Sequence, residues 1–241
     1  MSASDRTTDG ITTRESIAAL AYFALYLAFS FWSPGSEMRN YLTLVAGPLC
    51  LVVILRASDP LNRRPSPVLA SFGLRRGNLR TGLLWALVLG LLIGMFQLTQ
   101  RSAGPELWEL IRTGKALYLF PLAAAFGLLT AGFTEEFFFR GFLQTRIERL
   151  TGSAWIAVLI VTVAFGLYHV PFAYLNPNWP TAGDFPAALR LGMVEGGLGG
   201  VILGAAYVFW KRNLLACIVL HGMIDAVPIM TMIKFGGSGG G

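Results

Sequence analysis

The sequence consists largely of long apolar runs separated by short polar segments. The runs cover residues 17–32, 41–55, 81–98, 116–150, 154–169, 187–210 and 214–233. Several approach the roughly 20 residues that an α-helix needs to cross the hydrocarbon core of a bilayer. The pattern predicts an all-α fold, a polytopic transmembrane helix bundle of about seven spans, in which the first run is an uncleaved span.

Glycine and proline positions indicate where helices end and how they pack. Gly152 lies in a tight turn and is expected to end the fourth helix. Val170-Pro171 is expected to end the fifth helix at His169. Glycine recurs every fourth residue in the sixth run, which predicts a face that packs closely against another helix: Gly192, Gly196, Gly200 and Gly204.

Composition agrees with a membrane protein. Hydrophobic residues make up 54% of the 241-residue chain and charged residues only 13%, which is about half the charged fraction of a typical soluble domain. Residues 1–14 form a polar amino-terminal segment, residues 15–235 the transmembrane domain, and residues 236–241 an added glycine–serine linker. Residues 99–115 form a connection of mixed charge.

Basic residues are concentrated in one connection, residues 56–80, where six arginines face Asp59 alone. Connections rich in lysine and arginine lie in the cytoplasm, so this segment and the amino terminus are predicted there. The net charge of +6 then reflects membrane topology and indicates no nucleic-acid partner. The two cysteines, Cys50 and Cys217, both lie in apolar runs and predict neither a disulfide nor a zinc–thiolate site.

Two adjacent carboxylates, Glu135 and Glu136, interrupt the fourth run well inside its apolar part. An acid at this depth is costly and indicates a function and a partner. Arg140 lies four residues after Glu136 on the same helical face and can form an ion pair with it. Glu135 is rotated by about 100° and is left for another role. An ion pair that only holds helices together is the structural alternative.

The remaining intramembrane polar residues are predicted to lie at the same depth. Glu135 lies 17 residues before Gly152 and His169 lies 17 residues after it, so an antiparallel helix pair brings them level. His221 lies ten residues past the basic turn at Lys211, which gives about 15 Å from the same side at 1.5 Å per residue. The counts predict one buried polar site nearer the cytoplasm.

Three further residues belong to this prediction. Asp225 lies one turn after His221 and can orient its ring by accepting the ring proton. Phe165 lies one turn before His169 and is expected to pack against that imidazole. Glu195, in the glycine-rich sixth run, is predicted to have a structural or cavity-lining role.

The motifs Glu135-Glu136-x-x-x-Arg140, Phe165-x-x-x-His169 and His221-x-x-x-Asp225 resemble those of the CAAX-protease and bacteriocin-processing family of intramembrane proteases, also called Abi or CPBP. Their order and spacing match over residues of about 75–233, so residues 15–235 become the protease domain. The Ras-converting eukaryotic CAAX endoprotease has asparagine at the last position, whereas this chain has Asp225. The aspartate leaves open whether this position donates to an oxyanion or only orients His221.

The resemblance implies peptide-bond hydrolysis in the membrane. Glu135 can act as general base and acid toward water, with help from His169. His221 with Asp225 can stabilise the oxyanion, while Glu136, held by Arg140, fixes the geometry. These roles need no cofactor. The alternative is zinc bound by Glu135, His169 and His221, although the chain lacks the metalloprotease His-x-x-x-His helix.

Other classes of function remain open at this stage: a proton-coupled transporter, or a non-catalytic membrane scaffold or immunity protein. The expected location is a bacterial inner membrane. The expected partners are the lipid bilayer and a membrane-anchored or lipid-proximal protein substrate, with no nucleic acid. A prenylated CAAX protein, a bacteriocin leader and the carboxy-terminal sorting helix of a surface protein are all compatible substrates.

Topology provides a direct test, because the predicted cytoplasmic connection contains Ser66. A cysteine placed at this position should react only with reagents that reach the cytoplasmic face. Labelling from the exterior of intact cells would overturn the predicted orientation.

Overall fold

A computed structural model describes residues 10–32, 37–58, 68–74, 79–99 and 104–232, and none of these residues forms a strand. Four arginines of the 56–80 connection and Ser66 lie outside the described residues, as do the 236–241 linker and most of the 1–14 segment. The helical elements in chain order are α2 (Thr13–Trp32), α3 (Glu37–Asn40), η1 (Tyr41–Ala46), α4 (Gly47–Ala57), η2 (Val68–Phe72), α5 (Leu79–Thr99), α6 (Gly104–Arg112), α7 (Ala116–Gly127), η4 (Leu128–Gly132), α8 (Phe133–Glu136), η5 (Phe137–Gln144), α9 (Thr145–Thr151), α10 (Ala154–Leu175), α11 (Phe185–Leu191), η6 (Gly192–Gly196), α12 (Gly197–Phe209) and α13 (Leu214–Met232).

The predicted membrane bundle is confirmed in outline. Six helical segments of the described chain are long and apolar enough to cross a bilayer, and the apolar part of α13, Leu214–Met230, is a shorter seventh. The six are Thr13–Trp32, Met38–Ala57, Leu79–Gln97, Ala116–Thr151, Ala154–Leu175 and Phe185–Phe209. The protein is therefore an all-α bundle with buried polar residues.

The long helix that bears the glutamate pair is continuous over residues 116–151 but not uniform. Two π-helical segments, η4 and η5, flank the short α8 that carries Glu135 and Glu136. A π turn holds more residues than an α turn and shifts the faces of the residues beyond it. The Tyr41 hydroxyl donates a hydrogen bond to the Leu129 carbonyl in η4, which ties η1 to this segment.

One predicted boundary was wrong. The fifth helix does not end before Pro171 but continues as α10 to Leu175, because its apolar end packs against α11 through Val170, Ala173 and Ala188. Neighbouring helices compensate for the hydrogen bond that a proline removes in a membrane helix. The connection of mixed charge, residues 99–115, contains a helix of its own, α6.

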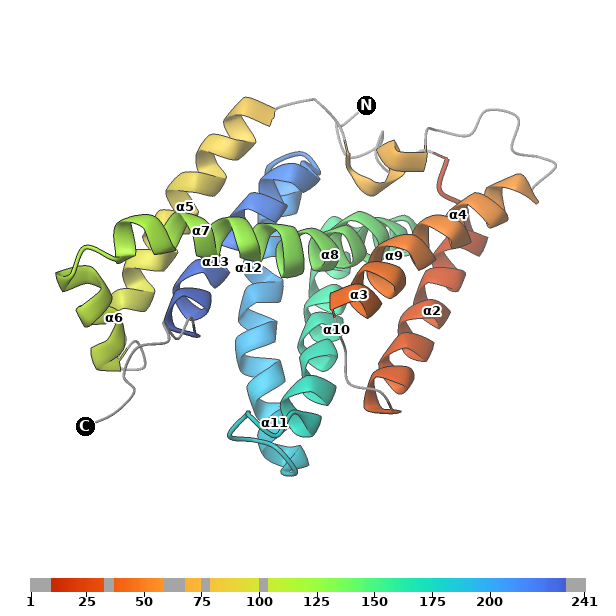
Figure 1. The fold of residues 1–241 in the computed structure, drawn as a ribbon. Helices are drawn as coiled ribbons and strands as arrows, with labels where there is room; N and C mark the ends of the chain where they lie inside the picture. Colours follow the sequence, from red (N-terminus) through yellow and green to blue (C-terminus); the bar gives the residue numbers. More distant parts are fainter. Residues whose placement is uncertain (1–9, 33–36, 59–67, 75–78, 100–103, 233–241) are drawn as a thin grey trace.

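Figure 1 shows how the long helix meets the others. The helix α7 runs from α6 toward α8, in the middle of the bundle. The helices α10 and α12 lie alongside each other. The predicted glycine face lies between α10 and the α11–η6–α12 helix. A Cβ on Gly192 would lie 2.7 Å from the Gly166 carbonyl oxygen, and one on Gly200 would lie 3.0 Å from Thr162 Cα. Larger side chains would separate these helices.

A second close approach brings α13 onto the long helix. A Cβ on Gly222 would lie 2.7 Å from the backbone nitrogen of Leu128. A Cβ on Gly132 would in turn lie 3.0 Å from the carbonyl oxygen of Ile218. Small residues at both positions therefore allow α13 to seat His221 directly beside the glutamate pair.

The polar end of the long helix is buried within the protein. Arg146 is fully buried; it bonds to Glu15 Oε2 at 3.4 Å and to the Ser71 carbonyl at 3.0 Å. Glu15 also pairs with Arg56 at 3.0 Å. Buried charges must be paired, so this cluster fastens α2, α4 and η2 to α9. Glu148 is buried against Arg212, at the turn before α13.

Candidate active site

One carboxylate oxygen lies at the centre of the polar layer. Glu136 is fully buried, and its Oε1 accepts hydrogen bonds from Arg140 Nη1 at 2.9 Å and from His221 Nδ1 at 2.8 Å. The ion pair with Arg140 is the one that the four-residue spacing predicted. The contact with His221 joins α8 to α13 and was not anticipated.

Arg140 is held from two further sides. Its Nη2 donates to the Gly200 carbonyl on α12 at 3.2 Å, and its guanidinium carbon lies 4.6 Å from the centre of the Phe165 ring on α10. A carbonyl and an aromatic face both suit a desolvated cation. Because Arg140 has no exposed surface, its position is fixed by these contacts, and it fixes Glu136 in turn.

Glu135 points to a different set of groups, as its rotation on the helix predicted. The Tyr168 hydroxyl donates to Glu135 Oε1 at 3.2 Å. Its other oxygen, Oε2, is buried and has no hydrogen-bond partner among the described residues. The nearest basic group is His221 Nε2, at 3.9 Å. Glu135 thus presents a carboxylate oxygen whose direction is set while its hydrogen-bonding capacity is unused.

His221 connects the two glutamates. Because a carboxylate oxygen only accepts, the short bond to Glu136 places the proton of that bond on Nδ1. The opposite atom, Nε2, faces Glu135 Oε2 at 3.9 Å and Asp225 Oδ2 at 3.5 Å. Asp225 therefore lies beside His221 as expected, but the closer partner that orients the ring is Glu136.

His169 on α10 packs against the rings of Phe165 and Tyr168. Its Nδ1 is 2.7 Å from the Phe165 carbonyl oxygen, one turn earlier. A carbonyl only accepts, so Nδ1 carries a proton and Nε2 is left as the functional atom. The centre of the Phe165 ring lies 4.7 Å from that of the His169 ring and 6.1 Å from that of the His221 ring, so Phe165 packs beside both imidazoles.

Tyr168 was missed by the sequence analysis, although a signal for it was present. It lies 16 residues after Gly152, and Glu136 lies 16 residues before that glycine. The same count that brought His169 level with Glu135 therefore also placed Tyr168 in the layer. From sequence, a tyrosine next to a candidate catalytic histidine could equally be a packing residue. Its hydroxyl contact with Glu135 shows that it belongs to the polar site.

Glu195 does not belong to this cluster. It lies in the π-helical segment η6, its side chain is exposed, and no described contact connects it to the site. The structural or cavity-lining role of Glu195 stays a prediction. Its neighbour Gly196 is the residue that faces the site, since a Cβ there would lie 2.8 Å from His169 Nδ1.

The zinc alternative would use Glu135, His169 and His221. Among the described residues, no group of three or more histidine, cysteine, aspartate or glutamate side chains is arranged to hold a metal ion. His169 holds Nδ1 on a backbone carbonyl and His221 holds Nδ1 on Glu136, so Nε2 is the ligand atom that each ring could offer. The choice between a metal-free site and a zinc site stays a prediction.

Residues 117–227 match the model of a protein family described as type II CAAX prenyl endopeptidase Rce1-like. The resemblance to the CAAX-protease family is therefore confirmed. The match covers somewhat less than half of the chain and includes the residues from Glu135 to Asp225. No curated protein and no solved structure matches the chain.

The apolar helices indicate an integral membrane protein, and the part of it that matches the family model contains the polar site. The matched segment runs from α7 to α13 and brings every contact of Glu135, Glu136, His169 and His221 described above into the Rce1-like region. The amino-terminal helices α2 to α5 lie outside it.

Stability distinguishes the two glutamates. Glu136→Gln leaves Arg140 without its carboxylate and should cost about 3–5 kcal/mol, as breaking a buried ion pair does. Glu135→Gln retains the acceptor for Tyr168 and should unfold within a few degrees of the unsubstituted protein. Thermal unfolding in one detergent measures both variants, and an earlier transition for Glu135→Gln would reverse the assigned roles.

Proposed function

We propose that this protein is an intramembrane endopeptidase that hydrolyses a peptide bond near or within the membrane, using water activated by Glu135. The observation that carries the proposal is the buried Oε2 of Glu135. It is aimed at His221 Nε2, and the Tyr168 hydroxyl holds the other oxygen of the same carboxylate. A general base needs both a fixed direction and a free lone pair.

The chemistry begins with a proton transfer from water to Glu135. The oxygen of that water forms a bond to the substrate carbonyl carbon, and the carbonyl oxygen becomes an oxyanion. The carbon–nitrogen bond then breaks, and Glu135 returns the proton to the departing amine. The atoms balance with water as the only co-reactant, and Glu135 ends in its starting state.

His221 is assigned to the oxyanion. Glu136 accepts a hydrogen bond from Nδ1–H and stabilises a positively charged ring, so that Nε2–H can donate to the developing charge. Asp225 lies 3.5 Å from the same Nε2 and stabilises the charged ring from the other side. This geometry favours the orienting role for Asp225 over a donor role, because an ionised carboxylate only accepts.

His169 is assigned to the attacking water. With the proton on Nδ1 held by the Phe165 carbonyl, Nε2 is an acceptor that can bind a water hydrogen. Phe165 and Tyr168 fix the ring, with ring centroids at 4.7 and 5.0 Å. His169 thus positions the water, and Glu135 removes its proton.

The substrate class follows from the location of the site and from the family match. A peptide bond reaches these residues only from a protein held at or in the membrane, so the proposed substrates are membrane-anchored or lipid-proximal proteins. The matched family is described as a CAAX prenyl endopeptidase, which makes a prenylated CAAX peptide the first substrate to test. A leader peptide and a carboxy-terminal sorting helix are the next two. The proposed location is a bacterial inner membrane, with the amino terminus in the cytoplasm.

Glu135→Gln tests the enzyme directly. The amide cannot accept the proton of water, so turnover should fall by about 10²–10⁴-fold, the usual contribution of a general base. The matched control is Glu109→Gln, which removes an exposed carboxylate on α6, outside the site. Cleavage by purified protein of a peptide from each substrate class is the measurement. Full activity of Glu135→Gln, or the same loss in both variants, would contradict the proposal.

Chelation tests the metal-free mechanism. Because the proposed charges all come from protein side chains, prolonged treatment with a strong membrane-permeable chelator should leave the rate unchanged. Excess zinc should inhibit, since a free metal ion competes for the carboxylates and imidazoles of the layer. One tightly held zinc per chain, lost together with activity and restored with it, would overturn the mechanism.

A further inference from the structure

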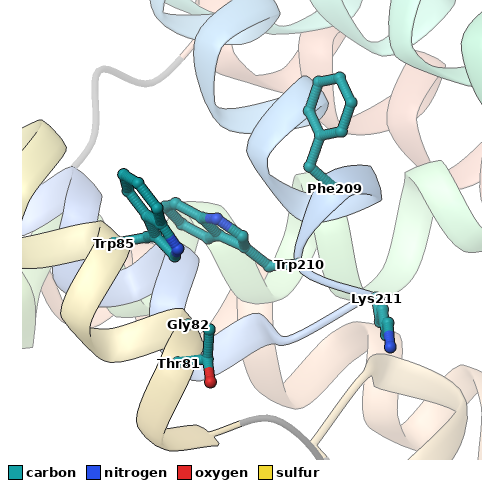
Figure 2. Close-up of a pocket in the computed structure, with 6 residues that line it drawn as sticks. All are labelled: Thr81, Gly82, Trp85, Phe209, Trp210 and Lys211. Atoms are coloured by element: carbon teal, nitrogen blue, oxygen red, sulfur yellow. The ribbon is translucent and has the colours of Figure 1, made fainter.

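A cavity of about 480 Å³ lies far from the glutamate pair in the fold, between the start of α5 and the turn that joins α12 to α13. Figure 2 shows the six residues that line it: Thr81, Gly82, Trp85, Phe209, Trp210 and Lys211. The size is that of a small-molecule site. None of the six belongs to the proposed catalytic layer.

The cavity lies at the end of its helices, where a membrane headgroup region is expected. The helix α5 begins at Leu79 and α12 ends at Phe209, so the cavity is formed by two helix termini. In the predicted topology both termini lie on the cytoplasmic side. Tryptophan and lysine at helix ends are typical of the membrane–water interface, and anionic lipids are concentrated in the cytoplasmic leaflet.

The turn between α12 and α13 contains two basic residues with different surroundings. Lys211 and Arg212 both have left-handed backbone conformations, with φ of 55° and 60°. Arg212 folds back and is buried in an ion pair with Glu148. Lys211 is exposed at the cavity and has no ion pair within the described part of the chain. Its charge is therefore available to a ligand.

A buried amide donor lies behind Gly82, one of the lining residues. Asn213 is 2% exposed, and its Oδ1 accepts a hydrogen bond from the Ala216 N–H, which identifies Nδ2 as the amide donor. Nδ2 has no hydrogen-bond partner among the described residues. It faces the cavity-lining Gly82, where a Cβ would lie 2.9 Å from Nδ2. An unpaired buried donor is costly, so this amide would gain from an acceptor that reaches it beside Gly82.

The lining combines a cation and hydroxyl with a large aromatic surface. Lys211 and Thr81 can bind phosphate oxygens, and no acidic side chain is among the six lining residues. The two indole rings lie between the facing ends of α5 and α12, where they can cover a glycerol backbone and the first carbons of acyl chains (Figure 2). A free phosphate would use the cation and leave the aromatic surface without a partner.

We propose that the cavity lined by Thr81, Trp85 and Lys211 binds the headgroup phosphate of an anionic glycerophospholipid, with its glycerol and upper acyl chains against the aromatic rings. The bound lipid joins α5 to the α12–α13 turn. Since Arg212 in that turn holds Glu148 of α9, the lipid supports the end of the helix that carries the catalytic glutamates. This site is independent of peptide hydrolysis.

The test measures lipid binding to delipidated full-length protein in a mild detergent. Phosphatidylglycerol and phosphatidylcholine with identical acyl chains are titrated, and binding is followed by native mass spectrometry and by thermal unfolding. Phosphatidylglycerol should bind preferentially and raise the unfolding temperature. Lys211→Gln should weaken its binding about fivefold, the factor for roughly 1 kcal/mol per basic residue at an anionic surface, and leave phosphatidylcholine binding unchanged.

Two matched controls make the test specific. Arg190→Gln removes an exposed charge from α11, and Trp108→Leu removes an exposed tryptophan from α6. Lys211→Gln and Trp85→Leu should each weaken phosphatidylglycerol binding, whereas neither control should. Because Trp85 and Lys211 are exposed, the fold should survive these changes, and the unfolding curves without lipid check this.

Three results would overturn the proposal. Equal binding of the two lipids would exclude recognition of the anionic headgroup. Equal effects of Lys211→Gln and Arg190→Gln would exclude this cavity. Equal thermal protection by inorganic phosphate alone would show a phosphate site without lipid. Each result is independent of peptidase activity, so it leaves the proposed function untouched.

Discussion

The site depends on one buried carboxylate, Glu136, whose Oε1 binds both Arg140 and His221. Without it, a guanidinium would be buried without a counter-charge, and an imidazole would lose the acceptor that sets its orientation. Two neighbouring helices hold Arg140 in place for this contact: the Gly200 carbonyl on α12 accepts a hydrogen bond from it, and the Phe165 ring on α10 packs against its guanidinium. The close approach of α13 at Gly222 brings His221 within reach. Three other helices therefore converge on one residue of α8.

This arrangement favours different roles for the two adjacent glutamates. Glu136 holds Arg140 and His221 through Oε1 alone, and its buried Oε2, like that of Glu135, has no hydrogen-bond partner among the described residues. The ion pair with Arg140 is what assigns Glu136 to structure. Glu135, one residue earlier, keeps a buried oxygen without a partner among the described residues and is aimed by Tyr168. His221 touches both, through Nδ1 on one side and Nε2 on the other. It can therefore transmit the fixed position of Glu136 to the reacting groups near Glu135. In the proposed mechanism, a structural ion pair and a reactive carboxylate therefore lie on neighbouring residues.

The sequence was sufficient where a local count decides the geometry. The four-residue spacing predicted the ion pair of Glu136 with Arg140. Equal counts from Gly152 predicted that Glu135 lies at the same depth as the part of α10 that it contacts. Contacts between distant segments were beyond such counts: the bond from His221 to Glu136, and the burial of Arg146 by Glu15. The π-helical segments add residues to a turn, so the outward face of Glu195 could not be derived from α-helical periodicity.

The central claim is that Glu136 orients His221 through its Nδ1 proton. The protein has only two histidines, so nitrogen-15 NMR of histidine-labelled protein in lipid nanodiscs resolves each ring. The account predicts a strongly deshielded Nδ1 proton on His221 that shifts upfield in Glu136→Gln, while the signals of His169, bound to a backbone carbonyl, keep their positions. A His221 ring whose signals are the same in both proteins, or a proton bonded through Nε2 instead, would contradict it.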